Sequence, residues 1–197
     1  MIHKPAGIAV SGNSFKNVGN ALRLNLKISP LADATSPHPV HRLDHATTGA
    51  LLVGKTRSSI RALNKAFENK EIAKIYYAAA IGKMEPNGEI SHQIDNKESL
   101  SIFSVCSTVD SVRFDKLNLV KLEPKTGRRH QLRIHLSSIG NPILGDKDYG
   151  TEGLVLMGKG MYLHAFSLQF THPFSKEQIL VDDPLPAKFQ KLFEPRS

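Results

Sequence analysis

The order of apolar patterns along this chain is the feature that most restricts its fold. Strand-like segments follow one another, at residues 7–10, 50–55, 75–81, 102–109, 117–123 and 163–170. Helical patterns are fewer, at residues 57–69, 128–139 and 184–193. In the first of these, Ile60, Leu63 and Phe67 recur at the spacing of one helix face. Because strands do not alternate regularly with helices, we predict an α+β fold with a mixed, largely antiparallel sheet flanked by helices.

Length and cysteine content narrow the class of protein. The chain has 197 residues, the size of one domain, and one cysteine, Cys106, which excludes an internal disulfide. No apolar run reaches the ~18 residues of a membrane-spanning helix, and the first residues show no signal-peptide pattern. We therefore expect a single domain over residues 1–197 that is monomeric, cytoplasmic and not bound to a membrane.

The basic side chains gather in two windows of the sequence. The whole chain has a net charge of +8. Residues 38–65 and residues 125–147 each contain five basic side chains and one acid, so each window carries +4. Two focused basic windows favour a polyanion such as nucleic acid as the partner.

Asp44 stands out inside the first window. It is the only acid between Asp33 and Glu68, and Arg42 and His45 lie beside it in the sequence. An ionised carboxylate in a basic, turn-rich loop is either one half of a structural salt bridge or a nucleophile kept ionised by nearby cations. Residue type alone leaves both interpretations open.

Arginines mark the second window. The expected helix at residues 128–139 has an apolar stripe made of Leu132, Leu136 and Ile139. At ~100° per residue, Arg133 lies about 90° from the centre of that stripe, at the border between the core and a cleft. There it can pair with a carboxylate, while Arg128 and Arg129 at the expected helix N-terminus can meet phosphates. The alternative is that all three arginines are solvated.

Several short motifs occur in a fixed order along the chain. They are residues 4–7 (KPAG), 41–49 (HRLDHATTG), 74–78 (KIYYA), 126–136 (TGRRHQLRIHL), 140–150 (GNPILGDKDYG), 163–165 (LHA) and 172–173 (HP). Together they resemble the motifs of the RluA family of RNA pseudouridine synthases, whose catalytic loop reads H-R-L-D-x-x-T-S-G. The matching motifs span nearly the whole chain.

The resemblance implies a pseudouridine synthase catalytic fold, a catalytic role for three residues and an RNA partner, transfer or ribosomal. Asp44 would be the nucleophile that acts on the ribose or the base of a uridine, Arg133 would pair with it, and Tyr76 would stack on the base or transfer a proton. RNA phosphates would meet side chains from both basic windows, namely Arg42, Lys125, Arg128, Arg129 and His130. The isomerisation needs no cofactor and no metal, and the target base must be flipped out of its helix.

The chain departs from the family pattern at two positions. Thr48 replaces the usual serine and keeps the hydroxyl, and Arg129 replaces a threonine and adds a charge. We expect no S4-type RNA-binding domain.

Two other functions are alternatives to the synthase. One is an RNA-binding module that kept the fold without the chemistry, which predicts a damaged catalytic loop. A metal-dependent nuclease, the other alternative, predicts clustered carboxylates near Asp44, and the sequence shows none there.

Overall fold

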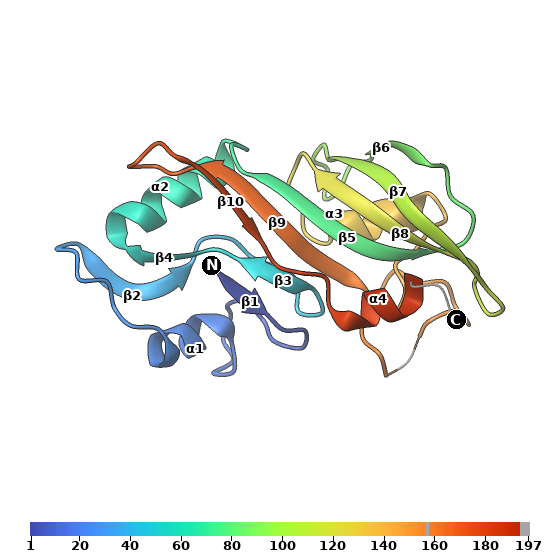
Figure 1. Cartoon of the computed structure of the whole chain (residues 1–197), viewed down its shortest axis with the longest axis horizontal. Helices are drawn as coiled ribbons and strands as arrows, with labels where there is room; N and C mark the ends of the chain where they lie inside the picture. The colour runs from blue at the N-terminus through green and yellow to red at the C-terminus, as the bar shows by residue number, and fades with distance from the viewer. Residues whose placement is uncertain (157, 194–197) are drawn as a thin grey trace. The chain divides into compact units, whose positions relative to one another are not determined.

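The computed structural model describes residues 1–156 and 158–193, which form two compact units (Figure 1). Unit 1 consists of residues 1–73 and 167–183, and unit 2 consists of residues 74–166 together with the segment that follows residue 183. The boundary runs through strand β9 (Leu163–Thr171), whose first four residues belong to unit 2 and the rest to unit 1. Unit 1 is therefore built from two separate stretches of sequence.

Short strands and two helices make up unit 1. Its elements besides β9 are β1 (Ile2–Lys4), α1 (Val18–Asn25), β2 (Ala34–Pro39), β3 (Thr48–Leu51), β4 (Val53–Thr56), α2 (Arg57–Glu68) and β10 (Gln178–Asp182). The pairs β1–β3, β2–β4 and β9–β10 are all antiparallel. The loop that carries Asp44 connects β2 to β3, so both of its ends are fixed by paired strands.

Helix α2 shows how the local sequence sets an element of unit 1. Thr56 caps its N-terminus, and the Thr56 and Ser59 side chains each accept a hydrogen bond from the other's backbone amide. The buried Leu63 joins a core that includes Leu168 and Phe170 of β9. The helix predicted at residues 57–69 is thus confirmed to within one residue.

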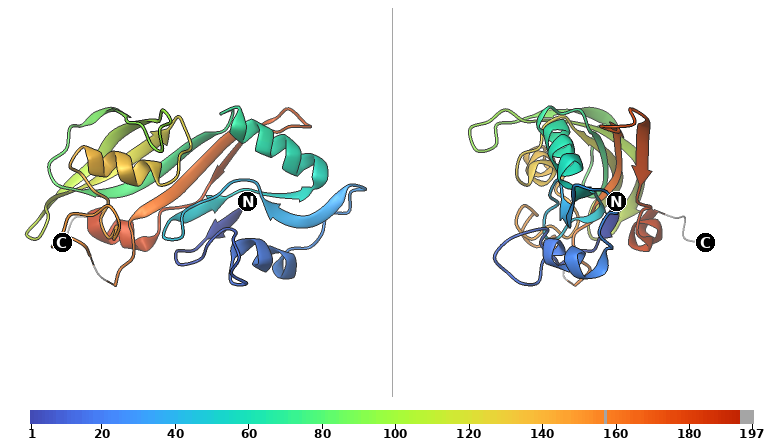
Figure 2. Two further views of the ribbon diagram at one scale, coloured as in Figure 1. Left: turned by 180° about the vertical axis from the view of Figure 1, so that it is seen from behind. Right: turned by 90° about the vertical axis from the view of Figure 1, so that its left-hand side faces the viewer.

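Unit 2 contains long antiparallel strands with a helix on each face. Its elements are β5 (Ala73–Ile81), β6 (Asn87–Ser91), β7 (Leu100–Ser111), β8 (Asp115–Pro124), α3 (Gln131–Ser138) and α4 (Ala187–Phe193). The strands lie in the order β5–β8–β7–β6. Figures 1 and 2, seen from opposite sides, show α4 in front of this sheet and α3 behind it. Phe189 of α4 is 1% exposed and packs in the core with Leu144 and Tyr162.

The fold class is confirmed, whereas several expected elements are wrong or incomplete. The structure is α+β with largely antiparallel strands. Residues 7–10 are not a strand, because Gly7 has a φ of +83° and belongs to the turn at residues 6–7. The strand expected at residues 50–55 is two strands, since the chain leaves β3 after Leu51 and begins β4 at Val53. The sequence patterns did not predict β1, α1, β2, β6 and β10. The single catalytic domain over residues 1–197 stays a prediction.

Candidate active site

Asp44 lies on a tight turn that precedes β3. The turn is closed by a hydrogen bond from the Thr47 amide to the Asp44 carbonyl at 3.1 Å. Leu43 on one side of Asp44 is buried and anchors the loop, while the Asp44 side chain is only partly buried. Arg42, on the other side of Leu43, is exposed. The buried Leu43 thus lies between an exposed Arg42 and a partly exposed Asp44.

The first motif of the chain holds this turn in place. The Gly7 amide donates to the His45 carbonyl at 2.9 Å, and the Lys4 ammonium donates to the same carbonyl at 3.3 Å. The left-handed φ of +83° at Gly7, which favours glycine, presents its amide in this direction. Residues 4–7 therefore act as a clamp on the residue that follows Asp44.

Lys4 is a buried cation in the neighbourhood of Asp44. Its side chain is 0% exposed, and its Nζ also donates to the Pro5 carbonyl at 2.8 Å. Burial lowers the pKa of Lys4 from 10.5 to about 8, and the negative charge of Asp44 opposes that shift. The carboxylate and the ammonium thus interact electrostatically within unit 1.

His41, at the start of the same loop, is fixed by a hydrogen bond and by stacking. Its Nε2 accepts from the Leu52 amide at 2.9 Å, so this nitrogen carries no proton. The imidazole stacks on the ring of Phe67 from α2, with the ring centroids 4.6 Å apart. The ring therefore connects the start of the loop to the residue after β3 and to α2.

The basic residues of the second window precede α3 rather than forming its first turn. His130 has a φ of +55°, in the left-handed region, so the helix begins at Gln131 and not near Arg128 as expected. The Arg128 guanidinium donates through Nε to the Glu98 carbonyl at 3.1 Å, and Arg129 is exposed. His130 Nδ1 lies 3.0 Å from the Tyr149 hydroxyl.

Lys125 completes the set of predicted RNA-binding residues. It follows β8 and donates through Nζ to the Glu123 carboxylate at 3.1 Å. Its side chain is about half exposed, so this pair is open to solvent and to competition from a phosphate.

Arg133 is more deeply placed than its helical position predicted. It is 5% exposed, buried rather than at a border. Its Nε and Nη2 donate to the two oxygens of Asp146 at 2.7 and 2.6 Å, and Nη2 also donates to Asp148 at 2.6 Å. The guanidinium carbon lies 4.9 Å from the centre of the Tyr149 ring. Although burial opposes it, hydrogen bonding to the two carboxylates raises the pKa of Arg133. Arg133 is thus held as a permanent cation.

Asp146 in turn is fixed by the backbone around it. Its Oδ1 also accepts from the amides of Asp148 and Tyr149, at 3.0 and 3.2 Å. The residue before it, Gly145, has a φ of +79°, and a Cβ there would lie 2.1 Å from the Gly160 carbonyl oxygen. Only glycine allows the backbone at residue 145 to lie this close to Gly160, and this close packing fixes the position of the Asp146 carboxylate that binds Arg133.

The structure places the three predicted catalytic residues on different elements. Asp44 belongs to unit 1, whereas Arg133 on α3 and Tyr76 on β5 belong to unit 2. Tyr76 is partly buried and is paired in register with Leu122 of β8. The predicted pairing of Arg133 with Asp44 and the role of Tyr76 stay predictions.

Sequence reasoning gave no role to Lys4, Asp146 or Asp148. All three lie inside the recognised motifs KPAG and GNPILGDKDYG, so the motif match was the available signal. The structure adds that Lys4 is a buried cation that interacts electrostatically with Asp44. It also shows that Asp146 and Asp148 accept hydrogen bonds from Arg133.

Known proteins share both the sequence and the fold of this chain. The profile of the family described as RNA pseudouridylate synthase matches residues 1–138. The chain belongs to this family. Its resemblance to the RluA group is confirmed, since a dual-specificity RNA pseudouridine synthase RluA of Vibrio parahaemolyticus is 36% identical over 152 residues, 69% of this chain and 61% of that protein.

Two further relatives match this chain over almost its whole length. The ribosomal large subunit pseudouridine synthase C of Pasteurella multocida is 33% identical over 98% of this chain and 63% of the relative. The uncharacterized RNA pseudouridine synthase YhcT of Bacillus subtilis is 33% identical over 98% of this chain and 67% of the relative. The chain thus spans about two thirds of the length of these relatives.

A solved structure confirms the fold of the chain. The human RNA pseudouridylate synthase domain containing 1 superposes with a TM-score of 0.75 at 27% identity, covering 92% of this chain and 78% of that one. Among residues 1–156 and 158–193, no three His, Cys, Asp or Glu side chains gather as around a metal ion. Over the same residues, no helix is long and apolar enough to cross a membrane.

Proposed function

We propose that this chain converts specific uridines of structured RNA, transfer or ribosomal, into pseudouridine. The proposal is carried by one observation, that Asp44 sits partly open on a turn whose backbone is clamped by residues 4–7 of the same motif set. The family to which the chain belongs supports it, and the names of relatives that act on the ribosomal large subunit favour ribosomal RNA among the substrates.

The reaction is balanced without an oxidant, a reductant or an imported group. The glycosidic bond between the ribose and N1 of uracil breaks, the base turns, and a bond forms from the ribose to carbon 5. The hydrogen of carbon 5 leaves to solvent and N1 takes up a proton. The reaction needs a nucleophile or a base beside the ribose and the uracil, and we assign this role to Asp44.

The other residues bind and position the RNA. Asp146 and Asp148 hold the guanidinium of Arg133, and we keep the assignment, implied by the family motifs, that Arg133 pairs with Asp44. Tyr76 would stack on the flipped base or transfer a proton. Exposed cations of the two windows, such as Arg42 and Arg129, would bind the flanking phosphates.

Replacement of Asp44 by Asn tests the catalytic proposal. The change keeps the shape and removes the nucleophile, so release of tritium from carbon 5 of labelled uridine in RNA should stop, while RNA affinity stays within a few fold. Asp110→Asn is a matched control, because the Asp110 side chain is 85% exposed on β7. Continued release by Asp44→Asn would refute the role of this residue.

The same assay distinguishes the two other candidate functions. An RNA-binding module without chemistry predicts that even the wild-type chain releases no tritium from any cellular RNA. A metal-dependent nuclease predicts strand cleavage that a chelator abolishes. Mapping of pseudouridines in cellular RNA with and without this gene would then identify the target position.

A further inference from the structure

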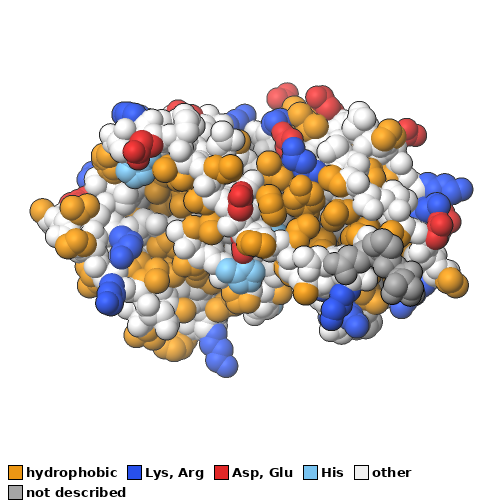
Figure 3. Space-filling model, viewed as in Figure 1, with side chains coloured by type: hydrophobic (Ala, Val, Ile, Leu, Met, Phe, Trp, Pro, Cys, Tyr) orange, Lys and Arg blue, Asp and Glu red, His pale blue; other side chains and the backbone are white. Residues whose placement is uncertain are grey.

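The N-terminal part of unit 1 has a surface that neither basic window includes. Residues 1–32 contain four basic side chains and no acid, although the chain outside the two windows is neutral in sum. Three of the four, Lys16, Arg23 and Lys27, are exposed. Figure 3 shows no acidic side chain over the place that α1 occupies in Figure 1. The segment is therefore a third positive region, with a net charge of +4.

The first acid after this segment does not cancel its charge. Asp33 accepts a hydrogen bond from the Ser58 amide at 2.9 Å at the start of α2. Hydrogen bonding from Ser58 lowers the pKa of Asp33, and the positive charge of Arg61 adds to the effect. The negative charge of Asp33 is therefore offset by the N-terminus of α2 and by Arg61.

Exposed apolar side chains accompany these cations. Four of them lie between residues 15 and 31, with exposed fractions of 80% for Phe15, 80% for Leu24, 65% for Ile28 and 63% for Leu31. Phe15 is the only aromatic residue among them and is followed directly by Lys16. An exposed aromatic ring interleaved with cations is typical of surfaces on which nucleic-acid bases stack.

The backbone around Phe15 is held in place although its ring is exposed. The Asn20 side chain donates to the Phe15 carbonyl at 3.0 Å, and the Asn17 side chain donates to the Ser14 carbonyl at 2.6 Å. Asn17 also caps α1 by accepting from the Asn20 amide at 2.9 Å. The right-hand view of Figure 2 shows this loop, between β1 and α1, standing out from the rest of unit 1. A ring presented on a fixed backbone loses little conformational entropy when it binds.

We propose that the loop before α1 and the segment through residue 31 form an accessory site for single-stranded RNA, in which Phe15 stacks on an unpaired base. Lys16, Arg23 and Lys27 would bind the phosphates on either side. The site rests on the proposed function, because it extends the RNA surface of an enzyme that acts on RNA. It would hold a single-stranded segment that flanks the structured target.

The arrangement of apolar residues favours RNA over a membrane surface. A helix that lies on a membrane buries one continuous apolar face in the lipid. In α1 the apolar face is buried in the protein core, since Val18 and Leu22 are 5% and 4% exposed. The exposed apolar residues lie before the helix, at its end and beyond it, so they offer separate contacts to bases.

A tryptophan at position 15 gives a direct test. The chain has no tryptophan, so Phe15→Trp in the full chain introduces a single fluorophore at the stacking position. We expect single-stranded oligoadenylate to quench its fluorescence, and added salt to shift the titration to higher RNA concentrations. Oligoadenylate contains no uridine, so the result does not depend on the isomerisation, which tritium release from the wild-type chain tests separately.

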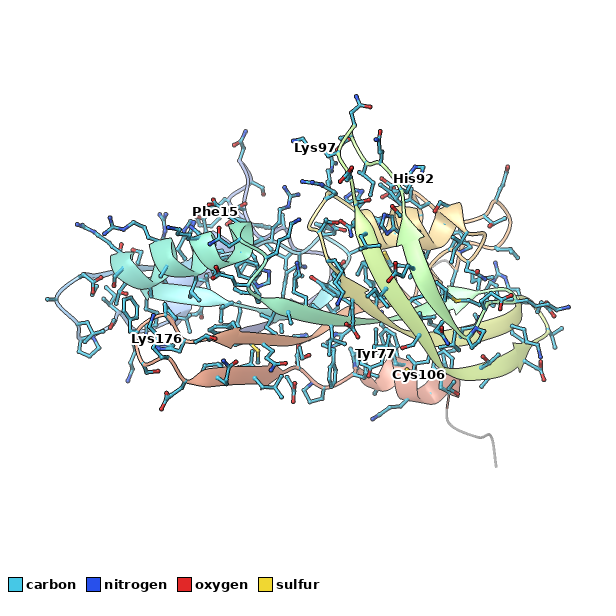
Figure 4. All side chains as sticks on the ribbon, turned by 90° about the horizontal axis from the view of Figure 1, so that it is seen from above. Phe15, Tyr77, His92, Lys97, Cys106 and Lys176 are labelled. Atoms are coloured by element: carbon cyan, nitrogen blue, oxygen red, sulfur yellow. The ribbon has the colours of Figure 1, made fainter. Side chains whose placement is uncertain are left out.

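The matched control is Phe174→Trp. Phe174 is 57% exposed on the β9–β10 turn, two residues from Lys176, which is labelled with Phe15 in Figure 4. Its fluorescence should not respond to oligoadenylate. In the wild-type background Phe15→Ala should weaken oligoadenylate binding by roughly 5- to 150-fold, the loss expected for one stacked base.

Several results would overturn the proposal. They are an unquenched Phe15→Trp, equal quenching of Phe174→Trp, or unchanged affinity in Phe15→Ala. A blue shift of the tryptophan emission with phosphatidylglycerol vesicles, without quenching by RNA, would assign the surface to a membrane instead and would equally refute it.

Discussion

Lys4 and Arg133 are both buried cations, and the difference lies in what surrounds them. Lys4 in unit 1 donates to two backbone carbonyls, and burial lowers its pKa to about 8. Arg133 in unit 2 donates to the carboxylates of Asp146 and Asp148, and although burial opposes it, this pairing raises its pKa. Burial without a direct anionic partner makes a cation titratable near working pH, whereas burial against two anions makes it permanent.

The largest effect is expected from removing the permanent cation. Arg133→Leu leaves Asp146, whose side chain is 0% exposed, as a charge that has lost its partner. Breaking a buried pair in this way costs ~3–5 kcal/mol, so the urea midpoint of unfolding should fall sharply.

A double variant checks the origin of that loss. Asp146→Asn removes the negative charge, so Arg133→Leu with Asp146→Asn should lose less stability than the two single variants added together. If the losses of the two single variants simply add, the two side chains do not stabilise each other. Arg133 would then not be a cation that depends on its pairing with a buried anion.

A smaller, pH-dependent effect is expected at Lys4. Its folded pKa of about 8 lies below its ordinary value of 10.5, so between these values the unfolded chain binds more protons than the folded one. Folding is then favoured as pH rises, and the contribution is lost as pH falls through about 8. From pH about 8 to about 10, the free energy of unfolding should rise by roughly 2 kcal/mol more in the wild type than in Lys4→Met. Parallel pH curves for the two proteins would mean that Lys4 keeps its ordinary pKa.

The smallest effect on stability is expected at a cation that is not buried. Arg129→Thr restores the usual family residue and removes an exposed charge, so unfolding should be unchanged. RNA affinity should fall, and the slope of log K against log salt should decrease by roughly 0.7 to 0.9, the value of one phosphate contact. Lys83→Thr, an exposed lysine outside both windows, is the control. An unaltered slope would show that Arg129 does not meet a phosphate.

The fold was predictable where local sequence and tertiary packing agree. In α2 the apolar spacing, the Thr56 cap and the burial of Leu63 all point to the same helix. Helix α1 was missed because Gly19 and two asparagines, Asn20 and Asn25, weaken its helical pattern. The start of α3 was placed too early, since a left-handed φ at a residue such as His130 is uncommon and no residue type announces it.

The candidate site was predictable to a similar extent. Asp44 was found because a lone acid in a basic loop is unusual, and the motif then gave it a role. The depth of Lys4 could not be foreseen, because lysine is almost never fully buried without a partner. The border position assigned to Arg133 was wrong, because the Asp146 and Asp148 carboxylates that draw it inward come from the loop after α3.

The split sequence of unit 1 has a consequence during synthesis on the ribosome. Residues 1–73 emerge first, but the core around Leu63 also requires Leu168 and Phe170 from β9, and the strand β10 that pairs with it. At ~5–20 residues per second, the nascent chain waits roughly 5–20 s for this second stretch. During that interval the apolar face of α2 lacks its strand partners, which makes the early nascent chain a candidate client for chaperones. The core of unit 1 is therefore completed only after residues 74–166 of unit 2 have been synthesised.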